Sequence, residues 1–295
     1  MRHLRLQPAL RKTLGFGAAA AVVCSLATLL LAADLNFHPG FDLFSVAQDV
    51  QLGKENSAQV EKQMPILDDE QASRYVNQLG RRLSAFAPNN ETDYVWQFRV
   101  LNSGDINAFA LPGGYIYVDR ATIESAEDEA ELAGVLAHEE GHVVMRHGTH
   151  QASEMMLAQK PLEILGGLVA AQSTSILGQL FQLGVGAGVQ SILLHYSRGL
   201  EAQADSVGTY ILYRAGYDPH AMAQFFGIIQ QKYPQQTLQF FSDHPSPGNR
   251  IKAVDEEIPE LGPAKAWLPD NPDFQSVKSR LRSLPPPPKP KPQPG

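Results

Sequence analysis

The sequence has a single cysteine, Cys24, in 295 residues. It lies inside an apolar stretch near the N-terminus, so the rest of the chain has no thiol with which to form a disulfide. A disulfide framework of the kind that stabilises small secreted domains is therefore excluded. We expect the folded part to depend on its hydrophobic core, supplemented by a metal ion if one binds.

Basic residues are also few, at 24 Lys and Arg against 31 Asp and Glu, and the net charge is -7. Four of the basic residues lie before Leu14, so the rest of the chain carries 20 basic against 31 acidic groups, or -11. No stripe of Lys or Arg interleaved with aromatic residues occurs, so no nucleic acid partner is expected. Hydrophobic residues make up 43% of the chain, which excludes a wholly disordered protein.

The N-terminal region combines a basic flank with an apolar stretch over residues 14–33, broken only by Ser25 and Thr28. This pattern predicts export of the following chain out of the cytoplasm. The stretch is long enough to span a bilayer, whereas Ser25-Leu26-Ala27 provides small residues at a spacing that suits cleavage. We therefore expect residues 1–33 to be either a signal peptide or an N-terminal membrane anchor.

The rest of the chain divides into a folded domain over residues 34–284 and a Pro/Lys-rich, extended tail over residues 285–295. Near the start of the domain, apolar residues at three- and four-residue steps predict a helix from Asp68 to just before Pro88. Strands are expected over residues 94–101 and on both sides of a Pro-Gly-Gly turn within residues 107–118, forming a small antiparallel sheet.

Helices dominate the remainder, so the predicted fold class is α+β and mostly helical. A capping box variant predicts a long helix over residues 125–146. Another helix is expected over residues 197–214, with further starts at Asp218-Pro219 and Ser246-Pro247. The Gly-rich apolar residues 161–196 are interrupted by glutamines and predict two buried or lid-like helices, with a peripheral membrane contact as the alternative.

The strongest chemical signal is the pattern His138-Glu139-Glu140-Gly141-His142 inside the first of these long helices. Histidines four residues apart lie on one helical face, about 6 Å apart along the axis, so both rings can reach one tetrahedral zinc ion. Glu139 is placed to take a proton from zinc-bound water, whose pKa the metal lowers from about 16 to about 7. The pattern predicts peptide hydrolysis, and the alternative is a helix with solvated charges.

A catalytic zinc site needs a third protein ligand, for which Glu201 is the best candidate. Asp205 lies one turn later on the same helical face and can orient a ligand histidine through its free ring N–H. The alternative is that both acids are solvated on a helix surface. The competing ligands are the other histidines that follow the motif, namely His147, His150, His195, His220 and His244.

Four motifs follow one another along the chain. They are Asn107-Ala108-Phe109-Ala110 with Pro112-Gly113-Gly114, His138 to His142 with Arg146-His147, Ser197-Arg198 with Glu201 to Asp205, and His244-Pro245 with Arg250-Ile251. In this order they resemble the motifs of the zinc metallopeptidases related to the CAAX prenyl proteases, especially their soluble bacterial periplasmic branch. The resemblance covers roughly residues 47–284.

This resemblance implies a gluzincin with a zincin-like fold, in which a small antiparallel sheet lies beside the zinc helix. It implies that His138, His142 and Glu201 bind one zinc ion, that Glu139 is the general base, and that Asp205 supports a ligand histidine.

The same resemblance assigns roles around the metal. It implies that an edge strand pairs with extended substrate through its main chain, although an ordinary hairpin is the alternative. It also implies that His244 and Arg250 approach the metal, either as donors to the oxyanion or, for His244, as an inhibitory fourth zinc ligand. The substrate-binding residues would be Asn107, Ala108, Phe109 and Ala110.

We therefore expect a zinc-dependent metalloendopeptidase in the periplasm of a bacterium. By analogy with the family, its substrates would be misfolded or misassembled proteins of the cell envelope. The alternative is a chaperone-like periplasmic module that binds unfolded proteins and has a latent or structural zinc site.

Overall fold

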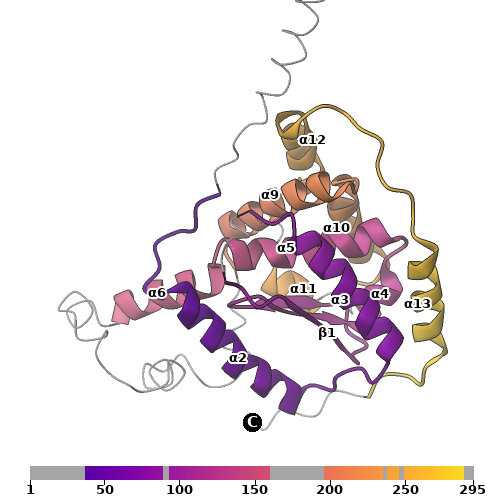
Figure 1. Cartoon of the computed structure of the whole chain (residues 1–295), viewed down its shortest axis with the longest axis horizontal. Helices are drawn as coiled ribbons and strands as arrows, with labels where there is room; N and C mark the ends of the chain where they lie inside the picture. The colour runs from indigo at the N-terminus through magenta and orange to yellow at the C-terminus, as the bar shows by residue number, and fades with distance from the viewer. Residues whose placement is uncertain (1–36, 89–92, 160–195, 235–237, 246–248, 289–295) are drawn as a thin grey trace, which may run out of the picture.

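A computed structural model describes residues 37–88, 93–159, 196–234, 238–245 and 249–288 (Figure 1). It confirms the expected α+β, mostly helical fold with a small sheet. The elements in chain order are α2 (Val46–Gln63), α3 (Glu70–Ser84), β1 (Gln97–Leu101), β2 (Ala108–Leu111), β3 (Tyr115–Asp119), α4 (Arg120–Ser125), α5 (Glu129–Val144), α6 (His147–Gln159), α9 (Arg198–Ala215), α10 (His220–Lys232), α11 (Leu238–Asp243), α12 (Arg250–Leu261) and α13 (Pro272–Ser283).

The sheet has the strand order β1-β3-β2 and is mixed. The hairpin of β2 and β3 is antiparallel, as expected, and its turn uses Gly113 and Gly114 at φ of 77° and 102°, which suit glycine. The expectation of a wholly antiparallel sheet is wrong for β1, which pairs with β3 in parallel. Strands β1 and β2 run in opposite directions, but they are not neighbours in the sheet. Strand β3 lies between them and runs in the same direction as β1.

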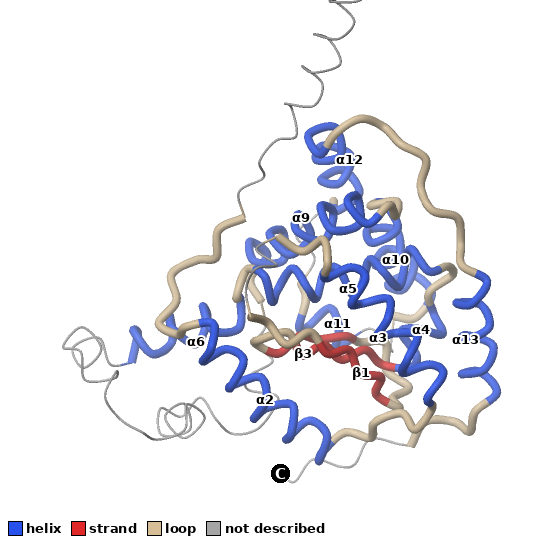
Figure 2. Tube along the Cα trace, in the orientation of Figure 1, coloured by secondary structure: helices blue, strands red, loops and turns tan. Residues whose placement is uncertain are grey.

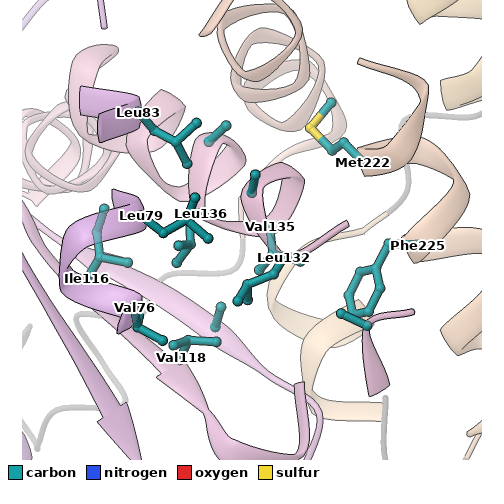
Figure 3. Packing of buried hydrophobic residues seen from close by; sticks show 14 of the residues in the cluster. Val76, Leu79, Leu83, Ile116, Val118, Leu132, Val135, Leu136, Met222 and Phe225 are labelled. Carbon is teal, nitrogen blue, oxygen red and sulfur yellow. The ribbon is translucent and has the colours of Figure 1, made fainter. Parts of the chain in front are cut away.

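Alternating side chains of the strands face two separate hydrophobic clusters. Phe98, Val100, Ile116 and Val118 face the main core. Figure 3 shows residues of α3, β3, α5 and α10 meeting in this core. On the other face, Val60 of α2 packs in the cluster that contains Leu101, Phe109, Leu111, Tyr115 and Tyr117. Helices therefore cover both faces of the sheet, with α9 and α10 packed on α5 (Figure 2).

The start of α5 differs from the sequence prediction. Ser125 ends the short helix α4, and Asp128 caps α5 by accepting a hydrogen bond from the Glu131 N–H. A separate turn thus divides what the sequence suggested was one helix, and Asp128 is the true cap. The boundaries of α9 agree with the prediction, because Ser197 caps it and Gly216 ends it at φ 92°.

Several expectations fall outside the described residues: the apolar stretch over residues 14–33, the helices of residues 161–195, the helix start at Ser246-Pro247 and the end of the tail from residue 289. Helix α12 is capped by Asn249. In the part of the chain that the structure describes, no helix combines the length and apolar character needed to cross a membrane.

Candidate metal centre

Helix α5 carries the His-Glu-Glu-Gly-His motif into the middle of the fold. Glu139 and His138 are fully buried, and His142 is only 2% exposed. The buried side of α5 packs against α9, α10, α3 and β2. The alternative of a helix with solvated charges therefore does not describe this segment.

Gly141 determines how closely α9 approaches α5. A Cβ atom at this position would lie 2.7 Å from the Ala204 carbonyl oxygen and 3.0 Å from its Cα. Such a contact is sterically impossible for any other residue without moving one of the helices. The glycine lets the backbones touch, and this places Glu201, about one turn before Ala204 on α9, opposite the two histidines.

Four side chains from distant parts of the sequence converge on one point. Ligand atoms of His138, His142, Glu201 and His244 all lie within 4.8 Å of one another, and all four residues are buried. The Nε2 atoms of His138 and His142 are 3.1 Å apart, and each lies 3.3 Å from an oxygen of Glu201. His244 Nδ1 lies 3.2 Å from Glu201 Oε1 and 3.4 Å from His138 Nε2.

These separations fit a tetrahedral metal ion. Zinc bonds to nitrogen and oxygen are about 2.0–2.2 Å long, so two ligands of a regular tetrahedron are separated by roughly 3.3–3.6 Å. The short separations of 3.1–3.4 Å lie close to this value, and no two ligand atoms of the four residues are more than 4.8 Å apart. Two imidazoles and a carboxylate are also a donor set that suits zinc. The residues present therefore fit a metal ion.

His138 is oriented through its second ring nitrogen. Its Nδ1 lies 2.9 Å from Asp205 Oδ1, and Arg250 Nε in turn lies 3.2 Å from Asp205 Oδ2. Because a carboxylate only accepts, the Nδ1 of His138 donates and its Nε2 is left for a metal. Burial lowers the pKa of His138, but the contacts with Asp205 and Glu201 outweigh burial and raise it to about 9. The predicted supporting role of Asp205 agrees with this position.

His142 has a different second partner. Its Nδ1 faces the Nδ1 of His147 at 2.8 Å, and the Nε2 of His147 lies 3.0 Å from Gln203 Oε1. Burial lowers the pKa of His142 well below its usual value and that of His147 to about 4. The Tyr196 ring stacks on His142 at a centroid distance of 4.0 Å. These contacts fix the ring of His142 from both its edge and its face.

Glu139 lies beside the cluster with both carboxylate oxygens buried and without a hydrogen-bond partner among the described residues. Among the described residues, His244 lies beside it, with Nε2 3.7 Å from Glu139 Oε1. Burial raises the pKa of Glu139. An unpartnered buried carboxyl group is costly for a fold, and its position beside convergent metal-ligating side chains makes Glu139 a candidate for chemistry.

Two electrostatic effects meet at Glu201. Burial raises its pKa, but the imidazoles of His244, His138 and His142 outweigh burial and lower it. Arg250 Nη2 donates to Glu201 Oε2 over 3.1 Å, while its guanidinium group lies over the Phe226 ring at 4.4 Å. Arg250 thus contacts both acids of the site, Glu201 and Asp205. The carboxylate of Glu201 is held in its charged form, which is the form that binds a cation.

The predicted substrate strand lies at an edge of the sheet. Among the described strands, β2 is hydrogen-bonded to β3 alone, so no described strand occupies its other side. At the start of this strand, Asn107 Oδ1 is buried and has no partner among the described residues. A small pocket beside the other end of β2 is lined by residues that include Leu111, Gly113, His142, Arg146 and Tyr196.

The other candidate histidines separate into two groups. His147 contacts the site through His142, and the two rings lie 4.9 Å apart. His150 instead contacts the Phe41 carbonyl group, and His220 lies between Asp218 and Asp255. His195 is outside the described residues. Sequence reasoning could not select Tyr196 or Gln203, because only the fold brings Tyr196 to His142 and Gln203 to His147.

A model of the family described as peptidase family M48 matches residues 70–258. The beta-barrel assembly-enhancing protease of Escherichia coli (strain K12) is 29% identical over 245 residues, covering 81% of this chain and 49% of that protein. The protein of the same name from Yersinia pestis is 31% identical with the same coverage. The mitochondrial metalloendopeptidase OMA1 of Schizosaccharomyces pombe is 32% identical over 188 residues, covering 63% of this chain and 53% of that protein. The chain spans about half the length of these curated relatives.

Proposed function

The chain belongs to peptidase family M48, and from this membership we propose that it is a zinc-dependent endopeptidase that cleaves peptide bonds in proteins. The proposal is carried by the convergence of His138, His142 and Glu201 beside the buried Glu139. A module that only binds unfolded proteins would have no use for an unpartnered acid at this place. The binding-module alternative is therefore not favoured.

In this proposal His138, His142 and Glu201 hold one zinc ion, which when bound acts as a Lewis acid on water and on the substrate carbonyl group. Glu139 takes a proton from the attacking water while the new C–O bond forms. It then passes that proton to the leaving nitrogen as the C–N bond breaks. Burial raises the pKa of Glu139 and so favours the protonated form that it holds between these two transfers.

We further propose that His244 occupies the fourth ligand position in the resting enzyme. Its Nδ1 lies within 3.4 Å of atoms of both His138 and Glu201, which supports a ligand role over an oxyanion donor. His244→Ala should then raise turnover of a small peptide, because water reaches the metal more easily. A fall in turnover would instead support the oxyanion role. Arg250 is the remaining candidate oxyanion donor.

The proposed substrate is an extended segment of a protein that pairs with the side of β2 on which no described strand lies. The strand residues Asn107, Ala108, Phe109 and Ala110 would supply main-chain hydrogen bonds, and the unpartnered Asn107 Oδ1 would accept one from the substrate. Two of the relatives reported above are named beta-barrel assembly-enhancing proteases. By analogy we propose that the substrates here are misassembled proteins of a bacterial cell envelope, reached after export to the periplasm.

The adjacent glutamates Glu139 and Glu140 provide a matched pair of variants to test this function. Casein cleavage with added zinc should be lost in Glu139→Gln and retained in Glu140→Gln, because Glu140 has no contact with the cluster among the described residues. Both variants should bind zinc as tightly as the wild type. Chelation should abolish wild-type activity and added zinc should restore it. Equal activity of wild type and Glu139→Gln would overturn the proposed mechanism.

A further inference from the structure

The two metal-facing histidines are oriented by different chemistry. The second nitrogen of His138 faces a carboxylate, which can only accept a hydrogen bond. The second nitrogen of His142 faces another imidazole, His147, at 2.8 Å. Either ring of such a pair can be the donor, so the contact alone does not decide which nitrogen of His142 carries the proton.

Gln203 resolves this ambiguity. Its Oε1 lies 3.0 Å from His147 Nε2 and, as an amide oxygen, can only accept. A neutral His147 then has its proton on Nε2, so its Nδ1 accepts from His142 Nδ1. The Nε2 of His142 is left with a free lone pair, 3.1 Å from His138 Nε2 and 3.3 Å from Glu201 Oε1.

We propose that Gln203 and His147 are positioning residues that fix His142 in its metal-binding tautomer. This inference rests on the proposed function, since it takes His142 as a metal ligand. With the opposite order of donors, His147 would donate to His142 Nδ1, and the proton on His142 Nε2 would then block the metal. The amide orientation of one exposed side chain thus controls a ligand in the buried site.

The backbone between the two histidines is shaped for this contact. Residues five apart on a continuous helix point about 140° away from each other. Here α5 ends at Val144, and Arg146 adopts the left-handed conformation at φ 55°, which is uncommon for a residue other than glycine. The chain therefore turns, and α6 begins with His147 directly against His142.

An ion pair stabilises that turn. Arg146 Nε lies 2.6 Å from Asp49 Oδ2, and its Nη2 donates to the Phe44 carbonyl oxygen over 2.5 Å. Asp42 Oδ2 lies a further 3.3 Å from Nη2. His147 itself is 1% exposed. A strained backbone persists only where the surrounding structure holds it. Here the ion pair of Arg146 holds the turn, and the turn places His147 against His142.

The test uses variants that change hydrogen bonding with little change in volume. Gln203→Met removes the acceptor, whereas Gln203→Glu keeps an acceptor and should rescue the contact. Ala202→Glu is the matched control, because it adds the same charge at the neighbouring exposed position of α9. His147→Phe removes the middle ring. Gln203 is exposed, so its variants should fold even if His147→Phe does not.

Two measurements are made on each protein: zinc affinity by competition with a chelator, and the tautomer of the His142 ring by nitrogen-15 NMR of the metal-free protein. We expect Gln203→Met to weaken zinc binding about 10-fold and His147→Phe about 10- to 100-fold. Both should lose the dominant Nδ1–H form of His142. Gln203→Glu should retain that form and bind zinc at least as tightly as the wild type, whereas Ala202→Glu should leave the tautomer unchanged.

The outcomes separate this inference from the proposed function. If Gln203→Met keeps both the wild-type tautomer and the wild-type zinc affinity, the positioning role is refuted. If Gln203→Glu loses affinity as Gln203→Met does, the acceptor argument is refuted. A separate variant, His142→Ala, tests the proposed function, because unchanged zinc affinity would remove His142 from the ligand set. The NMR measurement on the Gln203 and His147 variants would still decide whether these residues set the tautomer of His142.

Discussion

Gly141→Ala tests whether the close approach of α5 and α9 builds the metal centre. The new Cβ would lie 2.7 Å from the Ala204 carbonyl oxygen, against at least 3.4 Å for ordinary contact, so one helix must move by about 0.7 Å (3.4 minus 2.7). Overpacking of this kind costs about 1–3 kcal/mol, and replacing glycine by alanine within a helix returns about 1 kcal/mol. The net loss of stability is therefore small, about 0–2 kcal/mol.

Metal affinity should respond more strongly than stability. Ligand distances in metal sites are held to about 0.2 Å, which is less than the displacement that the new methyl group requires. Because Glu201 lies about one turn from Ala204, moving α9 carries this ligand away from His138 and His142. We expect zinc affinity to fall at least 10-fold, measured by competition with a chelator, with a parallel loss of casein cleavage.

Gly227→Ala provides the control. Gly227 lies within α10, and a Cβ atom there would meet nothing within 4 Å among the described residues. This variant should gain up to about 1 kcal/mol of stability in urea unfolding and bind zinc as the wild type does. If Gly141→Ala also binds zinc with wild-type affinity, the reasoning that the glycine sets the ligand geometry is wrong.

Three further variants test the fold around α5. Glu129→Ala should lower the free energy of unfolding in urea by about 3–5 kcal/mol, because the buried carboxylate accepts hydrogen bonds from Tyr75, Arg82, Tyr217 and Asn271. Glu70→Ala, at an exposed position, is the control and should change stability by less than about 1 kcal/mol. Glu140→Leu should raise the melting temperature, since both buried oxygens lack a partner among the described residues, and a lower melting temperature would contradict this. Burial raises the pKa of Glu131 to about 7, so the contribution of this group to stability is present below about pH 4.5 and is lost as the pH rises toward 7. Glu131→Gln should flatten this dependence of stability on pH. An unchanged slope of stability against pH would refute the assignment of this dependence to Glu131.

The sequence could predict features that depend on local spacing. The spacing from His138 to His142 determines which side chains share a helical face. Ser197 and Gly216 cap the two ends of α9, as expected. The position of Glu201 followed from its place on such a helix, combined with the need for a third ligand. Those features are set by helical geometry and by the backbone preferences of single residues.

Features that depend on contacts between distant segments could not be predicted in this way. The parallel pairing of β1 and β3 depends on which strand lies in the middle, and the strand patterns do not specify that order. The contact between His147 and His142 depends on a left-handed Arg146, a conformation that an arginine does not signal. The role of Gly141 also depends on the fold, in which its lack of a side chain lets α9 approach α5.

The two glutamates of the motif show why position, and not burial, identifies a catalytic acid. Glu139 and Glu140 are both fully buried, both lack a hydrogen-bond partner among the described residues, and burial raises the pKa of both. A shifted pKa therefore does not distinguish them. Successive residues of a helix point about 100° apart, and only Glu139 has a described contact with the cluster, through His244 at 3.7 Å. A difference in activity between Glu139→Gln and Glu140→Gln would thus arise from geometry alone, since the two substitutions remove the same group from equally buried sites.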